Sequence, residues 1–368
     1  MEGELHVRNR LLSHSVLVNS QLSIFWCDTA LTTPKKKIVT IHELAALANV
    51  SSASISRALA GLPGVSEGTR ERIRRLAEAT GYQPNFVAKS LSTGRSRRLA
   101  LIASDLSNAN YIIQFHEMEK IVRNRGYELL VADSERNSLL ELAHIERMRT
   151  HQVEGILIYP VCELTGENPE NLATALRAHN LPVVVLGSTA LAGMDNVGAD
   201  ETYNGSMLGQ RLRELGHKSV LVLAHDYLTD QPVNIRAKGL EAGLGPEVKM
   251  HIIDSLQPGW IEGAMKILMD PTVTACVSAG GRFLFAMYRP LIAAGRLQDL
   301  AMVSMEKDDF GNFLTPAPAQ ISPDIAGVAR EAALLLLERI QNPRGPLMQI
   351  RLKGLLEEGE TLLPAPKN

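Results

Sequence analysis

IVTIHELAALANVSSASISRALAGLPGVSEGTRERIRRLAEATGYQPNFVAKSLSTGR, residues 38–95, decides the architecture of this chain. Apolar residues at helical spacing predict three short helices within it, the second of them over about 52–59. Thr40 and Glu43 have the spacing of a capping box at the start of the first helix. Asn49 suits a left-handed turn between the first helix and the second. The stretch therefore predicts a helix-turn-helix, then a third helix that Gly81 ends, then a hinge segment.

Charge is distributed unevenly along the chain. Residues 35–98 contain 12 Lys and Arg against 4 Asp and Glu, whereas the whole chain has a net charge of −2, so residues 99–368 are acidic. A basic module on an acidic body indicates that contact with double-stranded DNA is confined to one end. Taken alone, four arginines of the third helix are expected to solvate its outer face: Arg70, Arg72, Arg74 and Arg75.

The predicted second helix has a small, polar outer face. Such a face lets a helix lie deep in the major groove. The sequence of this predicted helix and the sequences on either side of it resemble the lactose-repressor (LacI/GalR) family in three consecutive motifs. VTIHELAALANVSSASISRALAG resembles the family's DNA-binding headpiece, VSEGTRERI its third helix, and GYQPNFVAKSL its hinge motif, while a weaker likeness continues to about residue 362.

The resemblance implies a DNA-binding transcription regulator. Such a protein is expected to repress a carbohydrate-utilisation operon, binding a pseudo-palindromic operator as a homodimer. Arg57 would reach a guanine, and paired Leu91 side chains of two subunits would wedge into the central base step. Leu91 could instead be an ordinary apolar residue that anchors the linker. The DNA-binding residues that the resemblance implies are Thr40, Ser51, Ser52, Ala53, Ser54, Ser56, Arg57, Asn85, Ala88 and Leu91.

From Arg98 onward, short apolar runs alternate with helical patterns. This alternation predicts parallel sheets covered by helices on both faces. The resemblance implies the same α/β fold class: an all-α helix-turn-helix headpiece plus a periplasmic-binding-protein-like core of two doubly wound parallel-sheet subdomains. Strands are expected at 98–106, 127–133, 153–160, 181–187, 218–224, 248–254, 274–280 and 300–306. Helices are expected at 110–125, 139–150, 172–179, 202–215, from 236, 260–269, 283–294 and 325–341, and the segment 348–359 closes the chain.

These patterns predict a domain organisation. Residues 1–34 form a disordered extension or belong to an over-extended gene start, 35–83 form the helix-turn-helix domain, and 84–97 form the hinge helix and linker. Residues 98–368 form the effector-binding and dimerisation core, where the chain is expected to cross between subdomains near 198, near 320 and near the C-terminus. With no heptad repeat after the core, a tetramer through a C-terminal coiled coil is not expected.

A cleft between the two subdomains is the expected effector site, because ligands of open α/β sheets bind at the carboxyl ends of the strands. Where motifs match, the resemblance implies Asp105, Ser107, Asn108 and Arg236 as contacts, although Arg236 could also be a solvated helix residue. The sequence departs from the family pattern at two places, each at the end of a predicted strand: Gly280-Gly281-Arg282 and Ser304-Met305-Glu306. The expected effector-binding residues are Asp105, Ser107, Asn108, Arg236, Gly281, Arg282 and Glu306.

The departures at Gly281 and Arg282 bear on the effector's class. A lost carboxylate beside an arginine would suit an anionic ligand better than a neutral hexose, so the expected effector is a sugar, a sugar acid or a sugar phosphate. Two alternatives stay open: a regulator controlled by a protein partner through a vestigial cleft, and a small-molecule binding protein without a regulatory role. A basic headpiece speaks against the second alternative.

Composition and motifs exclude other classes. Hydrophobic residues make up 45% and charged residues 21%, typical of a soluble globular protein. Three scattered cysteines without a CxxC pattern argue against disulfides and zinc, and suit the cytoplasm. No apolar run reaches transmembrane length, so no membrane partner is expected. With no GxxxxGK[ST], GxSxG or HExxH motif, neither an enzyme nor a metal or cofactor site is expected.

Overall fold

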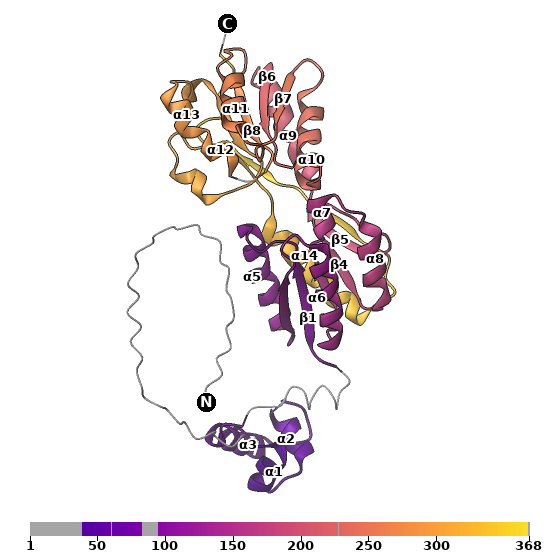
Figure 1. The fold of residues 1–368 in the computed structure, drawn as a ribbon. Coiled ribbons are helices and arrows are strands. Elements are labelled where there is room, and N and C mark those ends of the chain that lie inside the picture. The colour runs from indigo at the N-terminus through magenta and orange to yellow at the C-terminus, as the bar shows by residue number, and fades with distance from the viewer. Residues whose placement is uncertain (1–38, 60, 83–94, 227, 281, 367–368) are drawn as a thin grey trace, which may run out of the picture. The chain divides into compact units, whose positions relative to one another are not determined.

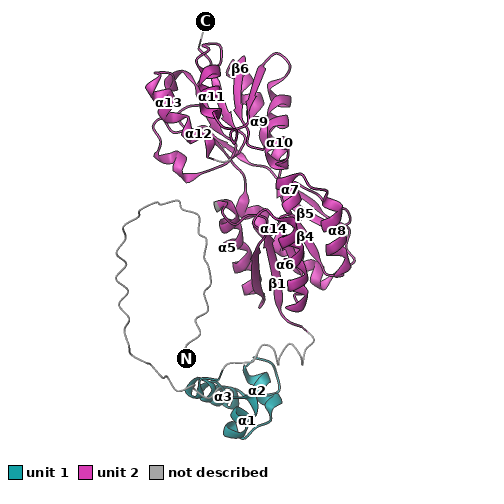
Figure 2. Ribbon diagram, viewed as in Figure 1, with its two compact units in different colours: residues 1–84 teal, residues 85–368 magenta. Residues whose placement is uncertain are grey.

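The computed structural model describes residues 39–59, 61–82, 95–226, 228–280 and 282–366. The chain divides into two compact units, residues 1–84 and residues 85–368 (Figure 2). The expectations for residues 1–34, and for Asn85, Ala88, Leu91 and Gly281, fall outside the described residues.

The first unit is the headpiece, a bundle of three helices (Figure 1). Its helices are α1 (Ile41–Ala48), α2 (Ser52–Leu59) and α3 (Glu67–Thr80). Helical spacing directs one apolar stripe of each helix inward, and the three stripes form one small core. That core is built from Leu44, Ala45, Ala48, Ile55, Ala58, Ile73 and Ala77.

The helix ends confirm the predicted caps. The amide of Glu43 donates to Thr40 Oγ1 at 3.3 Å, and the Thr40 amide donates back to Glu43 Oε2 at 2.9 Å, which completes the capping box. Asn49 has the left-handed conformation, with φ of 48°. Gly81 ends α3 in the same conformation, with φ of 65°. The turns that separate the helices are therefore encoded locally.

Two arginines of α3 do more than solvate its face. Arg70 is buried and donates to the backbone oxygens of Ala58 at 3.4 Å and Leu62 at 3.0 Å. Arg72 donates to the Ala48 oxygen at 3.0 Å. These bonds satisfy carbonyls near the ends of α1 and α2 that have no helical partner. The expectation of a solvated arginine was therefore wrong at Arg70, whereas Arg72 is exposed as expected and makes this bond in addition.

The second unit contains two six-stranded sheets. The first has the order β11-β5-β4-β3-β1-β2, and all its strands are parallel. The second has the order β12-β10-β9-β8-β6-β7, and there β12 alone pairs antiparallel. The strands are β1 (Arg98–Ala103), β2 (Glu128–Asp133), β3 (Ile156–Ile158), β4 (Val183–Leu186), β5 (Asp195–Ala199), β6 (Ser219–Leu223), β7 (Lys249–Ile253), β8 (Ala275–Ser278), β9 (Ala301–Ser304), β10 (Ala319–Ser322), β11 (Gln349–Leu352) and β12 (Leu355–Glu357).

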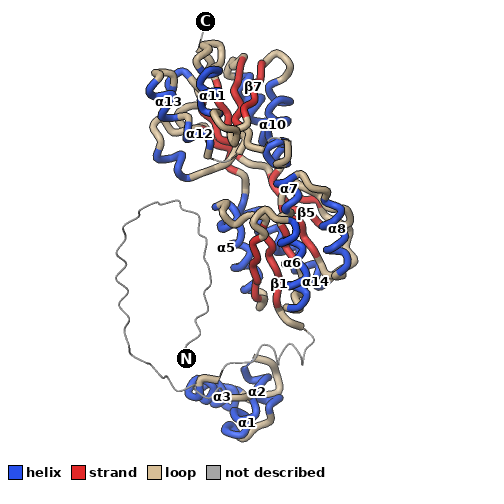
Figure 3. The backbone as a smooth tube through the Cα atoms, viewed as in Figure 1, coloured by secondary structure: helices blue, strands red, loops and turns tan. Residues whose placement is uncertain are grey.

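Helices cover both faces of each sheet, as Figure 3 shows. On the first sheet, α5 (Ala109–Asn124) and α14 (Ile325–Gln341) cover one face, and α6 (Ser138–Thr150) and α8 (Pro169–Ala178) the other. On the second, α9 (Glu201–Glu214) and α10 (Gln231–Leu244) oppose α11 (Trp260–Leu268), α12 (Phe283–Ala286) and α13 (Tyr288–Ala293). Short α7 (Val161–Thr165) follows β3. The predicted doubly wound arrangement is confirmed.

The chain passes between the sheets at three places. It leaves the first sheet after β5, returns from β10 into α14, and passes from β11 to β12 at Lys353-Gly354. Because β11 and β12 belong to different sheets, the predicted closing segment 348–359 is two strands rather than one element. Each subdomain is therefore assembled from distant parts of the sequence.

Several element bounds differ from the prediction. The helix expected from Arg236 begins at Gln231, because Asp230 caps it and Pro232 suits its first turn. The helix expected over 283–294 is interrupted at Met287. Pro290 explains the break, since it has no amide hydrogen for the carbonyl four residues earlier. Strands β5 and β10 were not predicted, because polar Asp195 and Asn196 and the short length of β10 gave no apolar run.

Helices α9 and α10 approach unusually closely at four glycines. A Cβ on Gly205 would lie 2.4 Å from the Arg236 oxygen, and one on Gly209 would lie 2.3 Å from the Leu240 oxygen. Gly239 and Gly243 are equally crowded from the other side. Only glycine allows backbones to pack at this distance. The contact fixes the position of Arg236, which the first turns of α10 carry toward the carboxyl edge of the second sheet.

None of the helices in the described part of the chain is long and apolar enough to cross a membrane.

Candidate nucleic-acid interface and effector cleft

The outer face of α2 is the candidate nucleic-acid surface. Ile55 and Ala58 point into the headpiece core, and the opposite side exposes Ala53, Ser56 and Arg57. Small side chains here leave the helix slim enough for a major groove. The remaining described residues expected to bind DNA lie around it: Thr40 and Ser51 are exposed, and Ser52 and Ser54 are half-buried.

His42 was missed in the sequence and lies beside this face. Its ring nitrogen Nδ1 is 3.2 Å from Ser52 Oγ, so α1 contributes a side chain next to the start of α2. Ser51 Oγ accepts from the Ser54 amide at 3.2 Å and caps α2. The Ser51 hydroxyl is therefore partly used in capping α2, whereas the Arg57 side chain is exposed on the outer face of that helix.

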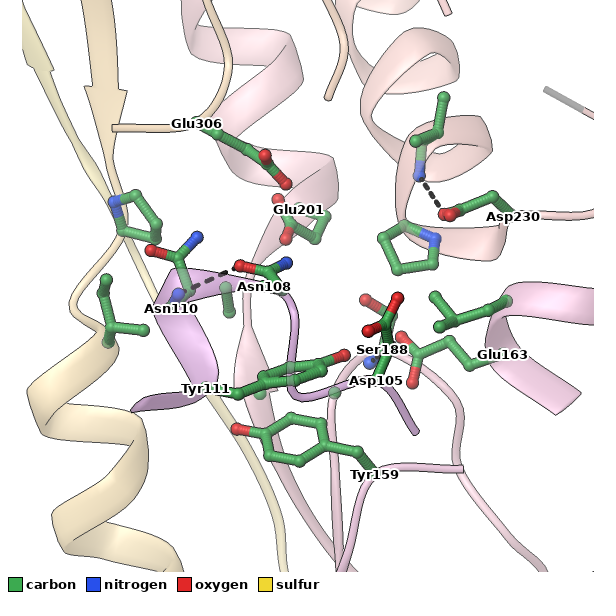
Figure 4. Close-up of a pocket in the computed structure, with 18 of the residues that line it drawn as sticks. Asp105, Asn108, Asn110, Tyr111, Tyr159, Glu163, Ser188, Glu201, Asp230 and Glu306 are labelled. Carbon is green, nitrogen blue, oxygen red and sulfur yellow. Dashed lines mark hydrogen bonds between the residues drawn. The ribbon is translucent and has the colours of Figure 1, made fainter. Parts of the chain in front are cut away.

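A cleft of about 210 Å³ lies in the second unit, where loops from both sheets meet at the strands' carboxyl ends (Figure 4). Asp105 follows β1, Tyr159 follows β3, and Ser188 follows β4. From the second sheet, His225 follows β6 and Glu306 follows β9. This is the edge at which open α/β sheets bind ligands.

Arg236 lies at the cleft wall in a set of buried ion pairs. It donates to both oxygens of Glu201, at 2.8 and 2.7 Å, to Glu306 Oε1 at 2.6 Å, and to the Ala279 oxygen at 3.1 Å. Burial alone would lower the pKa of Arg236, but the two carboxylates outweigh it and hold that pKa well above its usual range. The two carboxylates exceed the one guanidinium, so this set has a net negative charge.

Glu163 is a second buried acid, and in the described part of the chain it forms no ion pair with an arginine, although the charge of Arg351 acts on it. It follows β3 in α7, is 4% exposed, and accepts the Ser188 amide at 2.6 Å. Burial raises its pKa to about 7, opposed by that amide and reinforced by the charge of Asp230. Near neutral pH this carboxyl is therefore divided between its protonated and ionised forms.

Aromatic rings form part of the cleft wall. Tyr111 on α5 stacks on Tyr159, with ring centroids 4.4 Å apart. Tyr111 is anchored by its hydroxyl, 3.2 Å from Ser104 Oγ, and Tyr159 donates its hydroxyl to Gln114. Burial raises the pKa of both tyrosines well above the usual range, so both remain neutral. A rigid ring face of this kind suits the C–H face of a sugar.

Asp230 and His225 complete the wall on the second sheet's side. Asp230 Oδ1 accepts the Val233 amide at 3.2 Å and caps α10, while its Oδ2 is 3.5 Å from His225 Nε2. The other ring nitrogen of His225, Nδ1, has no hydrogen-bond partner although its atom is buried. Arg136, which also lines the cleft, pairs at 3.5 Å with Asp226 of the opposite subdomain.

The structure brings together some of the predicted effector residues and separates others. Asp105, Asn108, Arg236 and Glu306 line the cleft. Ser107 is exposed and is not part of the lining. Arg282, the basis for expecting an anionic ligand, is also outside the lining and pairs with Asp308. Glu306 supplies a carboxylate where the departure at Gly280-Gly281 suggested that one was lost.

Ten polar or aromatic lining residues were missed in the sequence. They share one signal, which is position: each follows a strand or lies in the first turns of a helix at the carboxyl edge. That signal requires correct strand ends, and several predicted strands ran too long. The missed residues are Asn110, Tyr111, Gln114, Arg136, Tyr159, Glu163, Ser188, Glu201, His225 and Asp230.

Comparison with known proteins connects both units to one family. Residues 40–85 match the family described as bacterial regulatory proteins, lacI family. Residues 97–313 match the family described as periplasmic binding proteins and sugar binding domain of LacI family. The second match alone covers more than half of the chain.

Individual relatives agree with this assignment. The chain is 25% identical over 337 residues to the HTH-type transcriptional regulator PtxS of Pseudomonas plecoglossicida, covering 88% of this chain and 96% of that protein. The lac repressor dimer bound to operator and the anti-inducer ONPF has a similar fold, with a TM-score of 0.76 at 20% identity, covering 89% of this chain and all of that one. The CelR–cellobiose complex matches with a TM-score of 0.61 at 24% identity, covering 88% and 99%.

The headpiece, the two-sheet body with its cleft and both family matches agree. The protein belongs to the LacI family of DNA-binding transcription regulators, which are not enzymes, and its body is the sugar-binding domain of that family.

Proposed function

We propose that the protein is a repressor that binds a pseudo-palindromic operator as a homodimer and responds to a small sugar-like effector in the cleft. The observation that carries the effector site is the cleft itself, where stacked tyrosines and polar side chains from both sheets surround about 210 Å³. Paired headpieces would match the two halves of such an operator. The protein would act in the cytoplasm, where its DNA target lies.

The charges in the cleft favour a neutral sugar over an anionic one. Arg236 is already paired with Glu201 and Glu306, so it offers little to a carboxylate or phosphate. An anionic effector beside Arg236 would add to the excess of negative charge that Glu201 and Glu306 already give this part of the cleft. The structure offers no observation in favour of control by a protein partner through a vestigial cleft.

The proposed base contacts come from the exposed face of α2. Arg57 would read a guanine, while Ser52 and Ala53 would allow close approach to the groove floor. Thr40, Ser51 and Ser54 would contact phosphates, and Ser56 extends the same face. The hinge residues Asn85, Ala88 and Leu91 would enter the minor groove, and effector binding would order or release them.

The DNA half of this proposal is tested with duplexes selected from a random pool by the full chain. Affinity should fall steeply with salt, as expected when several phosphates are contacted. Arg57→Ala should weaken binding to selected duplexes about tenfold or more and relax sequence preference at one position. Leu91→Ala should abolish binding to the selected duplexes. Its melting temperature should stay the same as that of the unsubstituted chain. Selected-duplex binding that is unchanged in both variants would refute these assignments.

The effector half is tested by thermal shift of the full chain with neutral sugars, sugar acids and sugar phosphates. A cleft ligand raises the apparent stability by mass action. Tyr111→Ala should remove the shift, because the ring that faces the ligand is lost. A ligand whose shift survives this substitution binds outside the cleft, and the proposed effector site would then be wrong.

A further inference from the structure

The carboxylates that line the cleft are not all paired. Five of them line it: Asp105, Glu163, Glu201, Asp230 and Glu306. Glu201 and Glu306 share Arg236, and Arg136 pairs with Asp226, which is not part of the lining. Among the residues that the structure describes, neither Lys nor Arg pairs with Asp105, Glu163 or Asp230. These three carboxyls therefore give the cleft a surplus of negative charge.

The three carboxyls act on a common region. The charge of Asp230 contributes to the raised pKa of Glu163, and the charges of both raise the pKa of Tyr111. Figure 4 draws Asp105, Glu163 and Asp230 around the pocket, with the ring of Tyr111 beside them. Acids gathered in this way are costly to bury unless a cation compensates them. Within the described ranges, His225 lies 3.5 Å from Asp230, and the charge of Arg351 acts on Glu163 without forming an ion pair with it.

We propose that the effector itself supplies the cation: an amino sugar whose ammonium group binds among Asp105, Glu163 and Asp230. This inference rests on the proposed function, since it names the chemical class of the cleft's effector. The ammonium would donate to the Glu163 and Asp105 oxygens, and the face of Tyr111 would lie against the sugar ring or the cation. Binding would ionise Glu163 fully, because a nearby positive charge favours the carboxylate.

A metal ion is a poorer fit than an organic cation. In the described ranges, no group of three or more His, Cys, Asp and Glu side chains is arranged to hold a metal. The acids are instead spread around a cavity large enough for a sugar, with a stacked aromatic wall. An ammonium group on a sugar ring can reach several separated carboxyls and still contact that wall.

The test uses matched ligands with the full chain near pH 6.5, by thermal shift and calorimetry. Glucosamine, galactosamine and mannosamine are each compared with the neutral parent hexose, the hexuronic acid and the N-acetyl derivative. The expected result is that at least one amino sugar binds about tenfold or more tighter than its parent and its N-acetyl form. The N-acetyl derivative controls for size, because it keeps the nitrogen substituent without the charge.

Variants connect the preference to the named carboxyls. Glu163→Gln should remove the amino sugar's advantage, measured as the ratio of its dissociation constant to that of the neutral parent hexose. Glu141→Gln is the matched control, because Glu141 is also buried with a pKa raised to about 7 but does not line the cleft. Asp105→Asn, at a partly exposed position, gives a second reading if Glu163→Gln fails to fold.

The outcomes separate this inference from the proposed function. If neutral hexoses or hexuronic acids bind as well as the amines, the ammonium is not recognised, yet the cleft is a sugar site and the proposed function stands. If no amino sugar stabilises the chain, the inference is wrong. If an amino sugar binds but Glu163→Gln and Asp105→Asn keep its advantage, the assigned carboxyls are wrong.

Discussion

The two walls of the cleft stabilise buried acids in different ways. On the wall from the second sheet, Glu201 and Glu306 are ionised against Arg236. On the wall from the first sheet, Glu163 is hydrogen-bonded by the backbone amides of Ser188 and Thr189 and by the Ser188 side chain, and burial raises its pKa to about 7. The ion pairs hold the side chains of the wall from the second sheet in place and use up the charge of Arg236. The Glu163 carboxyl can gain or lose a proton near neutral pH, so the wall from the first sheet can respond to the charge of a ligand.

The largest expected effect comes from breaking the ion pairs. Arg236→Met removes the cation that buried Glu201 and half-buried Glu306 share, so the free energy of unfolding should fall by about 3–5 kcal/mol. Urea denaturation of the full chain, followed through the transition of the second unit, measures this loss. The triple variant with Glu201→Gln and Glu306→Gln should recover most of this loss, because the two negative charges that Arg236 neutralised are then gone. No recovery would mean that Arg236 stabilises through packing rather than charge.

Removing the charge of Glu163 should have a smaller effect of opposite sign. In the folded protein this carboxyl keeps its proton until about pH 7, whereas in the unfolded chain it ionises near its ordinary pKa of 4.5. Stability therefore falls as the pH rises from about 4.5 to 7 and then levels off. Glu163→Gln should raise the free energy of unfolding at pH 8 by on the order of 1–3 kcal/mol and change it little at pH 4.5.

Glu141 gives an independent check on that sign. Burial raises its pKa to about 7 as well, and its carboxylate accepts the Val161 amide at 2.8 Å. Glu141→Gln should show the same pH profile of stabilisation as Glu163→Gln without any change in ligand binding. A stability gain that is equal at pH 4.5 and pH 8 in either variant would contradict a titrating carboxyl as its cause.

The smallest expected effect concerns Arg282, which pairs with Asp308 at the surface. Its side chain is 58% exposed, and exposed ion pairs contribute little because water and salt screen them. Arg282→Gln should change the free energy of unfolding by less than about 1 kcal/mol. It should also leave effector binding unchanged, measured by the same calorimetry. Weaker binding of an anionic sugar in this variant would restore Arg282 to the site.

The headpiece could be predicted from the sequence because the hydrogen bonds that cap its helices are local. The Thr40–Glu43 box and the Ser51–Ser54 cap join residues three apart, so spacing alone identifies them. In the cleft, Arg236 meets partners 35 and 70 residues away. Its presence at the edge was predicted, but its pairing depends on how two helices and a strand end are packed. Glu163 of α7 was missed because that helix is a single turn with no periodic pattern.

The glycine contact between α9 and α10 has a consequence for motion. At Gly205 and Gly243 a Cβ would lie 2.4 and 2.2 Å from facing backbone atoms, so α9 and α10 pack backbone against backbone within the second subdomain. A pair packed this closely is expected to move as one solid body. We therefore expect closure of the cleft to be a hinge rotation, with dihedral changes at the three crossover segments. Two of those segments end close to residues 200 and 323, and the third is Lys353-Gly354, so a stiffening substitution there would slow the response while leaving both binding surfaces intact.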